Sequence, residues 1–351
     1  MNSTRSGAQS GTAMEREIRQ QPLMWSNLID QHEEILNVVA AIRAFAPRSI
    51  QFIARGTSDH AAIYAKYLAE VLCGLPAGLA SPSTMTLYGA RPDLSDVLVI
   101  GISQSGGSPD LSHAMGVSRE CGALTIALTN DPRSAMATAA KHHIDMRAGE
   151  ELAVAATKSY TAELLNLFLL FDALAGGTGG ATAMLPELGE QLINDAGCLP
   201  ELVDRFQGVE RTVVTGRGYS FATAREGALK LMETTYLSAQ AFSGADLLHG
   251  PIAMIGTGFP VLLVAGDGAG GDAMTTVVER LRELDADLFV IGSQAIVDRT
   301  GAGIVVPGHV GEKLSPVLEI LPFQLLALNL ARAKGIDPDQ PRGLLKVTRT
   351  L

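Results

Sequence analysis

Apolar runs along the chain stop abruptly at small polar residues and glycine, and helical patterns follow them. The run from Val97 to Ile102 is apolar and largely β-branched, which is typical of a strand covered on both faces of a parallel sheet. Ile50–Ala54 and Ala123–Leu128 have the same character. Strands that alternate with helices at this spacing predict an α/β fold with a doubly wound parallel sheet.

The sequence pattern of the first half of the chain is repeated in the second half. Thr212–Gly218 has the pattern of Phe52–Gly56, and Val261–Gly268 has the pattern of the central strand and its polar loop. This internal duplication predicts two tandem doubly wound, flavodoxin-like domains, each with three αβα layers. The predicted divisions are a disordered tail at 1–13, a first domain with its N-terminal helix at 14–195, a second domain at 196–335 and a C-terminal tail at 336–351.

Three connecting segments carry further predictions. The amphipathic pattern from Met14 to about Phe45 predicts helix, with a break near Pro22. Gly149-Glu150-Glu151 is expected to be a polar hinge, and the glycine-rich stretch 176–180 a flexible linker.

Hydroxyl residues and glycines fill the segment that follows the central strand, from Ser103 to Ser108. Glycine permits close backbone approach, and serine hydroxyls donate hydrogen bonds without bulk. Pro109 suits the first position of a helix, whose free N–H groups would favour an anion in the loop. The loop lacks the Gly-Lys-Ser/Thr ending of a nucleotide P-loop, so we predict a small phosphate ester as its ligand. For this loop alone, an ordinary strand-to-helix turn is the alternative.

Two other loops also join a predicted strand to a predicted helix and could be considered as phosphate sites. Gly56-Thr57-Ser58 ends the first strand and precedes a helix predicted from Ala61 to Cys73. Taken alone, Ser58 or Asp59 is more simply an N-cap than a ligand-binding residue. The second copy has Asp267 where the first copy has serines, and its carboxylate would repel phosphate. We therefore expect only the first copy to hold a phosphate.

Three charged residues, Glu226, Lys230 and Glu233, are spaced i, i+4 and i+7 on a predicted helix and so share one face. Such a face is usually solvated. However, a helix carboxylate together with a titratable imidazole such as His249 is what proton transfer on a sugar needs. Lys346, in the irregular tail, could serve as a Schiff-base amine if desolvation or a nearby cation lowered its pKa.

Composition narrows the function classes. The 351 residues suffice for two domains, and a net charge of −10 argues against a nucleic-acid partner. The three cysteines have no CxxC spacing, which suits a reducing compartment and provides no metal framework. Neither a signal-peptide core nor a membrane-length apolar run is found. We expect a cytoplasmic protein with no membrane partner and no cofactor.

Several motifs together resemble the sugar-isomerase (SIS) family, most closely the isomerase half of glutamine:fructose-6-phosphate aminotransferases and their stand-alone relatives. The resemblance runs from Met14 to Lys346 and implies two tandem SIS domains. The motifs are Gly56-Thr57-Ser58, Ser103-Gln104-Ser105-Gly106, Val154–Lys158, Glu226–Lys230, Leu248–Pro251, and Gln340–Arg342 with Leu344 and Lys346.

The resemblance also implies residue roles. Glu233 would move a proton between C1 and C2, and Lys230 would assist it. His249 would help to open the sugar ring, often from the neighbouring subunit, which implies a homodimer with a shared site. Lys346 would form an imine with the keto sugar, and the tail 336–351 would cover the active site. The implied substrate-binding residues are Thr57, Ser58, Ser103, Gln104, Ser105, Ser108, Val154 and Leu345.

Departures from the aminotransferase pattern shape the functional hypothesis. That enzyme begins with a glutaminase domain and a catalytic cysteine, whereas only a short tail without cysteine precedes Met14, so we expect no ammonia from glutamine. Gly107-Ser108 stands where the aminotransferase has Glu-Thr, and Asp246 where it has Glu. The segments Ala54–His60, Ser105–Asp110 and Ala155–Tyr160 resemble those of stand-alone glucosamine-6-phosphate deaminases.

The hypothesis is therefore an isomerising deaminase that converts glucosamine 6-phosphate into fructose 6-phosphate and ammonia. Two other enzymes of the family remain as alternatives, an aldose–ketose isomerase of phosphosugars and a deglycase of fructosyl-amino acid 6-phosphates. A non-catalytic phosphosugar sensor is the alternative from another class.

Overall fold

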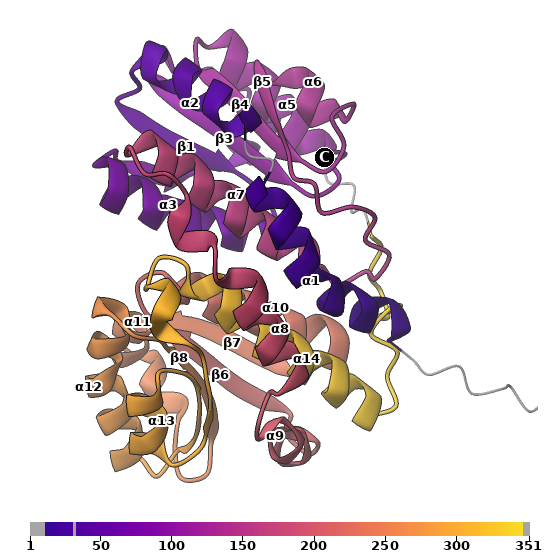
Figure 1. Ribbon diagram of the computed structural model, residues 1–351, viewed down its shortest axis with the longest axis vertical. Coiled ribbons are helices and arrows are strands. Elements are labelled where there is room, and N and C mark those ends of the chain that lie inside the picture. Colours follow the sequence, from indigo (N-terminus) through magenta and orange to yellow (C-terminus); the bar gives the residue numbers. More distant parts are fainter. Residues whose placement is uncertain (1–10, 31–32, 347–351) are drawn as a thin grey trace, which may run out of the picture.

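The computed structural model describes residues 11–30 and 33–346. Two lobes lie one above the other, and each contains a five-stranded parallel sheet between helices (Figure 1). The strand order is β2-β1-β3-β4-β5 in the first sheet and β7-β6-β8-β9-β10 in the second, so the two domains share one topology. The prediction of two tandem doubly wound domains is confirmed.

The central strand of the first sheet is β3, and all seven of its residues are buried. The strands are β1 (Ser49–Ile53), β2 (Ala77–Leu79), β3 (Val97–Ser103), β4 (Leu124–Thr129) and β5 (His142–Asp145). The helices are α1 (Thr12–Asp30), α2 (Glu33–Phe45), α3 (Thr57–Cys73), α4 (Pro82–Thr86), α5 (Pro109–Glu120), α6 (Ala135–Ala139) and α7 (Lys158–Leu174).

The second domain repeats this arrangement around β8, whose apolar residues fill the centre of its sheet. The strands are β6 (Arg211–Gly216), β7 (Ser238–Ser243), β8 (Pro260–Ala265), β9 (Asp287–Gly292) and β10 (Gly303–Val305). The helices that follow α7 are η1 (Gly180–Thr182), α8 (Leu185–Asn194), α9 (Leu199–Phe206), α10 (Ser220–Thr235), α11 (Gly244–Leu248), η2 (Pro251–Met254), α12 (Ala269–Glu283), α13 (Gln294–Thr300), η3 (Gly308–Val310) and α14 (Ser315–Ala333). Of these, η1 and α8 lie within the range 14–195 predicted for the first domain.

One hydrophobic core joins the two domains. Helices α3, α7, α10 and α14 lie between the sheets (Figure 1), and their buried side chains pack with the inner faces of both. The outer face of each sheet has its own smaller core, under α5 in the first domain and under α12 in the second. Because α3 packs directly against α10, side chains of these two helices can meet across the domain boundary.

Helix α1 differs from its prediction because it runs through Pro22 without a break and ends at Asp30. Tertiary packing accounts for this, since Trp25 and Leu28 are buried and the Trp25 indole N–H donates to Thr161 Oγ1 at 3.1 Å. The predicted disordered tail falls mostly on residues 1–10, outside the described residues, whereas Thr12 already belongs to α1.

Helix α3 also begins earlier than predicted, at Thr57, so Thr57 and Ser58 lie in its first turn. Gly56 makes this abrupt start with a φ of 57°, a conformation that glycine adopts without strain. The N-cap is therefore Gly56, and the N-cap interpretation of Ser58 or Asp59 is wrong. Glu151 is likewise buried rather than part of an exposed hinge.

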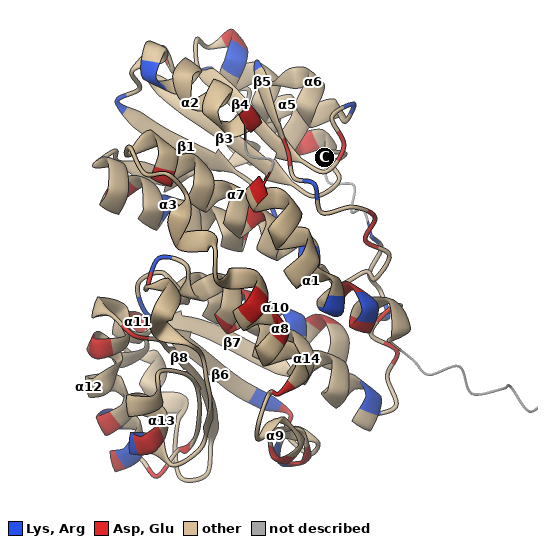
Figure 2. Cartoon of the chain, in the orientation of Figure 1, with Lys and Arg blue, Asp and Glu red and all other residues tan. Residues whose placement is uncertain are grey.

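Charged positions are spread over both domains (Figure 2). In the part of the chain that the structure describes, no helix has the length and apolar character needed to cross a membrane.

Candidate active site

Serine side chains fix the backbone of the loop between β3 and α5 through local hydrogen bonds. The backbone N–H of Gly106 donates to Ser103 Oγ at 3.1 Å, and that of Gly107 donates to Ser105 Oγ at 3.2 Å. Gly106 has a φ of 59°, and a side chain at this position would clash with Ser134. The loop geometry therefore requires glycine here.

Helix α5 starts at this loop with a free N-terminus. Ser108 is its N-cap residue, but the hydroxyl makes no capping hydrogen bond, and Pro109 follows at the first helical position. An anion at this end can accept hydrogen bonds from the backbone and gains from the helix dipole. Gln104 is fixed to the next loop by its carbonyl, which accepts from the Asn130 N–H at 3.0 Å.

Arg55 is a candidate that its sequence pattern did not single out. Its guanidinium lies 3.1 Å from Asp110 Oδ2, in the first turn of α5. The Asp110 side chain is buried, whereas that of Arg55 is about half exposed. Arg55 therefore places a half-exposed guanidinium, paired with Asp110, at the first turn of α5.

The equivalent position of the second domain is already filled. Glu312, from the loop before α14, accepts hydrogen bonds from the backbone N–H groups of Ala269 at 3.1 Å and Gly270 at 2.7 Å. These residues begin α12, so a carboxylate of the chain itself occupies the place that an anion would take. This supports the expectation from Asp267 that the second copy holds no phosphate, and Glu312 is the stronger reason.

The predicted charged face of α10 is the centre of a buried network between the domains. Glu226 Oε1 accepts from Thr57 Oγ1 at 3.0 Å and lies 3.2 Å from Lys230 Nζ, while Glu226 Oε2 lies 2.7 Å from His60 Nδ1. Lys230 Nζ also donates to Thr57 Oγ1 at 3.2 Å. Glu226 and Lys230 are both completely buried. The interpretation of this face as solvated surface is therefore excluded.

Electrostatics hold this network in a charged state. Burial acts to raise the pKa of Glu226, but Lys230 and the hydrogen bond with His60 outweigh it and lower that pKa overall. Burial acts to lower the pKa of Lys230, but Glu226 and Glu233 outweigh it and raise that pKa. Lys230 is thus a permanent cation at the centre of the site.

Glu233 is the carboxylate of the network that reaches solvent. Its Oε2 lies 2.6 Å from Lys230 Nζ, and about a fifth of its side chain is exposed, whereas Glu226 has none exposed. A carboxylate fixed by a buried cation and open on one side can contact a bound molecule. The spacing of Glu226, Lys230 and Glu233 did predict that they share a face, but not that Thr57 and His60 would complete it.

Lys346 anchors the tail on the first domain. Its Nζ donates to Glu151 Oε2 at 2.8 Å and to the Ala153 carbonyl at 2.7 Å. Glu151 is buried and also accepts from Ser159 Oγ at 2.7 Å. Burial acts to raise the pKa of Glu151, but Lys346 and the backbone N–H groups of Ser159 and Thr157, which donate to Glu151 Oε1, lower it overall. Lys346 must leave this ion pair before it can act as a nucleophile.

Among the described residues, no hydrogen bond joins three of the remaining predicted residues to the α10 network. His249 follows α11 and is exposed, and its backbone N–H donates to the Asp246 carbonyl at 3.0 Å. Leu345 is 77% exposed. Val154 is half-buried, and its N–H donates to the Asp339 carbonyl at 3.4 Å. Within one chain, His249 and Leu345 do not join the charged network.

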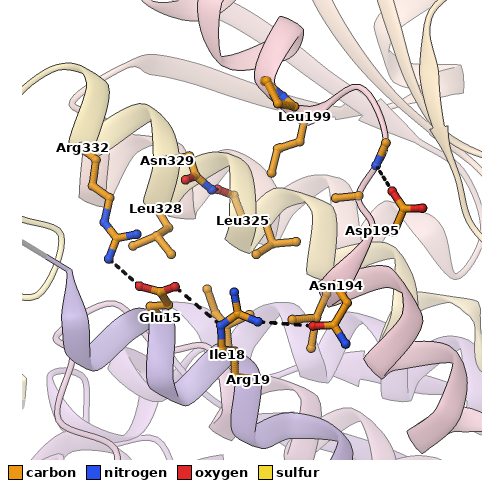
Figure 3. Close-up of a pocket in the computed structure, with 14 residues that line it drawn as sticks. Glu15, Ile18, Arg19, Asn194, Asp195, Leu199, Leu325, Leu328, Asn329 and Arg332 are labelled. Atoms are coloured by element: carbon orange, nitrogen blue, oxygen red, sulfur yellow. Dashed lines mark hydrogen bonds and ion pairs between the residues drawn. The ribbon is translucent and has the colours of Figure 1, made fainter.

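A separate pocket of about 300 Å³ lies between α1, α8 and α14 (Figure 3). Glu15 lies on one wall, 2.7 Å from Arg332 and 3.5 Å from Arg19. None of the predicted site residues lines this pocket. Among residues 11–30 and 33–346, no group of three or more His, Cys, Asp or Glu side chains could hold a metal ion.

Comparisons with known proteins agree with this architecture. The SIS domain model matches residues 45–173 and 206–330. The chain is 33% identical over 337 residues to the glutamine–fructose-6-phosphate aminotransferase of Methanothermobacter thermautotrophicus, a match that covers 95% of this chain and 56% of the relative. The chain spans about half the length of the curated relatives that it matches.

Solved structures show the same likeness. A protein provisionally assigned as a phosphosugar isomerase from Silicibacter pomeroyi has a TM-score of 0.86 and 33% identity, over 93% of this chain and 99% of that one. The C-terminal domain of the Francisella tularensis aminotransferase has a TM-score of 0.79 and 25% identity, over 97% and 100%. A glucosamine-6-phosphate deaminase from Thermotoga maritima, at 21% identity, shares the fold with a TM-score of 0.77, over 97% and 100%.

Proposed function

The chain belongs to the SIS domain family, and on that premise we propose that it is a phosphosugar isomerase that works as an isomerising deaminase. It would convert glucosamine 6-phosphate into fructose 6-phosphate and ammonia. The observation that carries the proposal is Glu233, a partly exposed carboxylate 2.6 Å from the buried Lys230 ammonium, in a network that also contains Thr57. Such a carboxylate suits proton transfer between neighbouring sugar carbons.

The serine loop is the proposed phosphate site. Ser103, Ser105 and Ser108 with the free N-terminus of α5 supply donors for phosphate oxygens, and Arg55 adds a positive charge at 3.1 Å from Asp110. Gln104 belongs to the same loop. The sugar carbons would then extend toward Thr57 and Ser58 at the start of α3.

Proton transfer follows from the position of Glu233. In the open-chain amino sugar, Glu233 would remove the proton from C2, which gives an enolamine, and would return it to C1. The product is an imine at C2 with a hydroxyl group on C1. Lys230, which bridges Glu233 and Thr57, would stabilise negative charge that develops during the transfer.

Release of ammonia requires water at C2. Water adds to the imine carbon, the C2–N bond breaks, and ammonia leaves as the ketone forms. In a second version of this step, the Lys346 amine displaces ammonia at C2 and water then hydrolyses the lysine imine. Lys346 would have to exchange its 2.8 Å ion pair with Glu151 for the substrate, and Leu345 would move with it.

Ring opening is the proposed task of His249, which is exposed and is not a member of the buried network of its own chain. We propose that it serves the site of a neighbouring chain in a homodimer. Val154, next to the Ala153 carbonyl that accepts from Lys346, would line the sugar at the same site.

The direct test is ammonia release from glucosamine, galactosamine and N-acetylglucosamine 6-phosphates with purified protein. We expect release from glucosamine 6-phosphate. No release from any of the three, together with thermal stabilisation by fructose 6-phosphate, would refute the deaminase and favour an isomerase, deglycase or sensor.

An aldose–ketose isomerase of phosphosugars is the second candidate, because the Silicibacter pomeroyi protein, 33% identical, has a provisional assignment of that kind. The same C2-to-C1 transfer by Glu233 would act on a hydroxyl in place of an amine. Interconversion of glucose 6-phosphate and fructose 6-phosphate without any nitrogen substrate would identify this activity.

A further inference from the structure

The two domains repeat a buried pair made of a serine and a glutamate. In the first domain, Ser58 in the first turn of α3 donates to Glu163 Oε1 on α7 at 2.7 Å. In the second, Ser220 in the first turn of α10 donates to Glu319 Oε1 on α14 at 2.9 Å. Helices α3 and α10 follow equivalent strands, and α7 and α14 follow equivalent final strands. The pairs are therefore counterparts in the duplicated fold.

The two glutamates differ in how their oxygens are satisfied. Glu319 accepts from Ser220 and Ser315 on one oxygen and from Thr223 on the other, at distances of 2.9, 2.9 and 3.1 Å. Glu163 accepts from Ser58 alone, and its Oε2 is buried without a partner among the described residues. A buried oxygen without a hydrogen bond is costly, so its retention calls for an explanation.

The surroundings of Glu163 suggest why this residue is retained. Glu163 lies close enough to Glu226, Glu151 and Lys230 for their charges to act on it, and its partner Ser58 is the chain neighbour of Thr57, which belongs to the α10 network. Burial, more than these neighbours, raises the pKa of Glu163 well above its ordinary value. The charged residue that acts on Glu319 is Glu312, of the same domain. The three hydroxyl groups that donate to Glu319, from Ser220, Ser315 and Thr223, also belong to that domain.

We propose that Glu163 is a positioning residue of the sugar site, which fixes the Ser58 hydroxyl so that its oxygen accepts a hydrogen bond from a hydroxyl or amino group of the substrate. This inference rests on the proposed function. The Ser58 proton is directed to Glu163 Oε1, which leaves the oxygen lone pairs for the ligand. Glu319, fully satisfied within its own domain, has only a structural role.

The test compares Glu163→Met with Glu163→Gln. Methionine keeps the length of the buried side chain but accepts no comparable hydrogen bond, so we expect KM for glucosamine 6-phosphate and Kd for fructose 6-phosphate to rise about tenfold. The value of kcat should change by no more than about twofold, because the lost contact orients substrate in ground and transition states alike. Glutamine retains an accepting oxygen and should bring KM back to within about threefold of the wild type.

Glu319→Met is the matched control, since it removes the counterpart pair outside the proposed site. It should lower thermal stability and leave KM unchanged. A double variant with Ser58→Ala and Glu163→Met should bind no more weakly than Ser58→Ala alone, because both changes remove one interaction.

Either of two outcomes would overturn the role of Glu163 and leave the proposed function standing. One is a wild-type KM in Glu163→Met, and the other is an equal rise of KM in Glu319→Met. If the wild-type protein neither releases ammonia nor binds fructose 6-phosphate, the proposed function fails and the role of Glu163 fails with it. Wild-type turnover in the same assay therefore separates the two failures.

Discussion

Replacement of Lys230 should lower the free energy of unfolding far more than replacement of a surface lysine. Lys230 Nζ lies 3.2 Å from Glu226 and 2.6 Å from Glu233, and Lys230 and Glu226 are completely buried. Loss of one partner from a buried ion pair costs about 3–5 kcal/mol, because the remaining charge is left uncompensated. Thr57 and His60 still bond to Glu226, so we expect Lys230→Met to lose about 3 kcal/mol, at the lower end of this range.

The effect should depend on pH in a defined direction. In the wild type, the pKa of Glu226 is lowered below its ordinary value of 4.5, so its contribution to stability is present above that pH and is lost as the pH falls through the folded pKa. Without Lys230, burial should raise the folded pKa of Glu226 above 4.5. Its contribution is then present below 4.5 and lost as the pH rises, so the variant should be penalised more at pH 8 than at pH 5.

Urea unfolding followed by circular dichroism at pH 5, 7 and 8 measures this difference. Lys66→Met is the matched control, because Lys66 forms an exposed i,i+4 pair with Glu70 at 3.9 Å and such pairs contribute about 0.3–0.5 kcal/mol. The reasoning is refuted if Lys230→Met loses less than about 1 kcal/mol at pH 7, or if its loss is the same at all three pH values.

Two further predictions concern carboxylates outside the α10 network. Glu312→Ala removes the acceptor for two N–H groups at the start of α12, so thermal unfolding should show a loss of about 1 kcal/mol while KM stays unchanged; an altered KM would contradict the separation of this position from the site. Lys346→Met leaves Glu151 buried without its cation, so both stability and kcat should fall, and limited proteolysis should cut the tail sooner. Wild-type kcat and cleavage rate would show that Lys346 neither anchors the tail nor acts in catalysis.

Local sequence patterns were sufficient for the sheets and the serine loop. Buried parallel strands require continuous apolar runs such as Val97–Ile102, and the loops that follow them require glycine at positions such as Gly106. Helical spacing likewise placed Glu226, Lys230 and Glu233 on one face. These features depend on residues that are close in the chain, which is why they could be predicted.

Contacts between segments that are distant in the chain could not be predicted from local sequence patterns. Pro22 lies inside a continuous helix because the packing of Trp25 and its neighbours outweighs the lost hydrogen bond. Glu151 and Glu312 occupy loops whose composition indicates solvent, yet each is satisfied by residues brought together only by the fold. The pairing of Glu163 with Ser58 joins residues 105 positions apart, and no periodicity connects them.

The central claim is that Glu233 moves the proton in an isomerising deaminase, and kcat for ammonia release by Glu233→Gln tests it most directly. Fructose 6-phosphate binding by the same variant, measured by calorimetry, is the control for an intact site. A well-placed base contributes about 10²–10⁴ to rate, so we predict that kcat falls at least about 100-fold while the Kd for fructose 6-phosphate changes by less than about threefold. Ammonia release by Glu233→Gln at the wild-type rate would contradict the account.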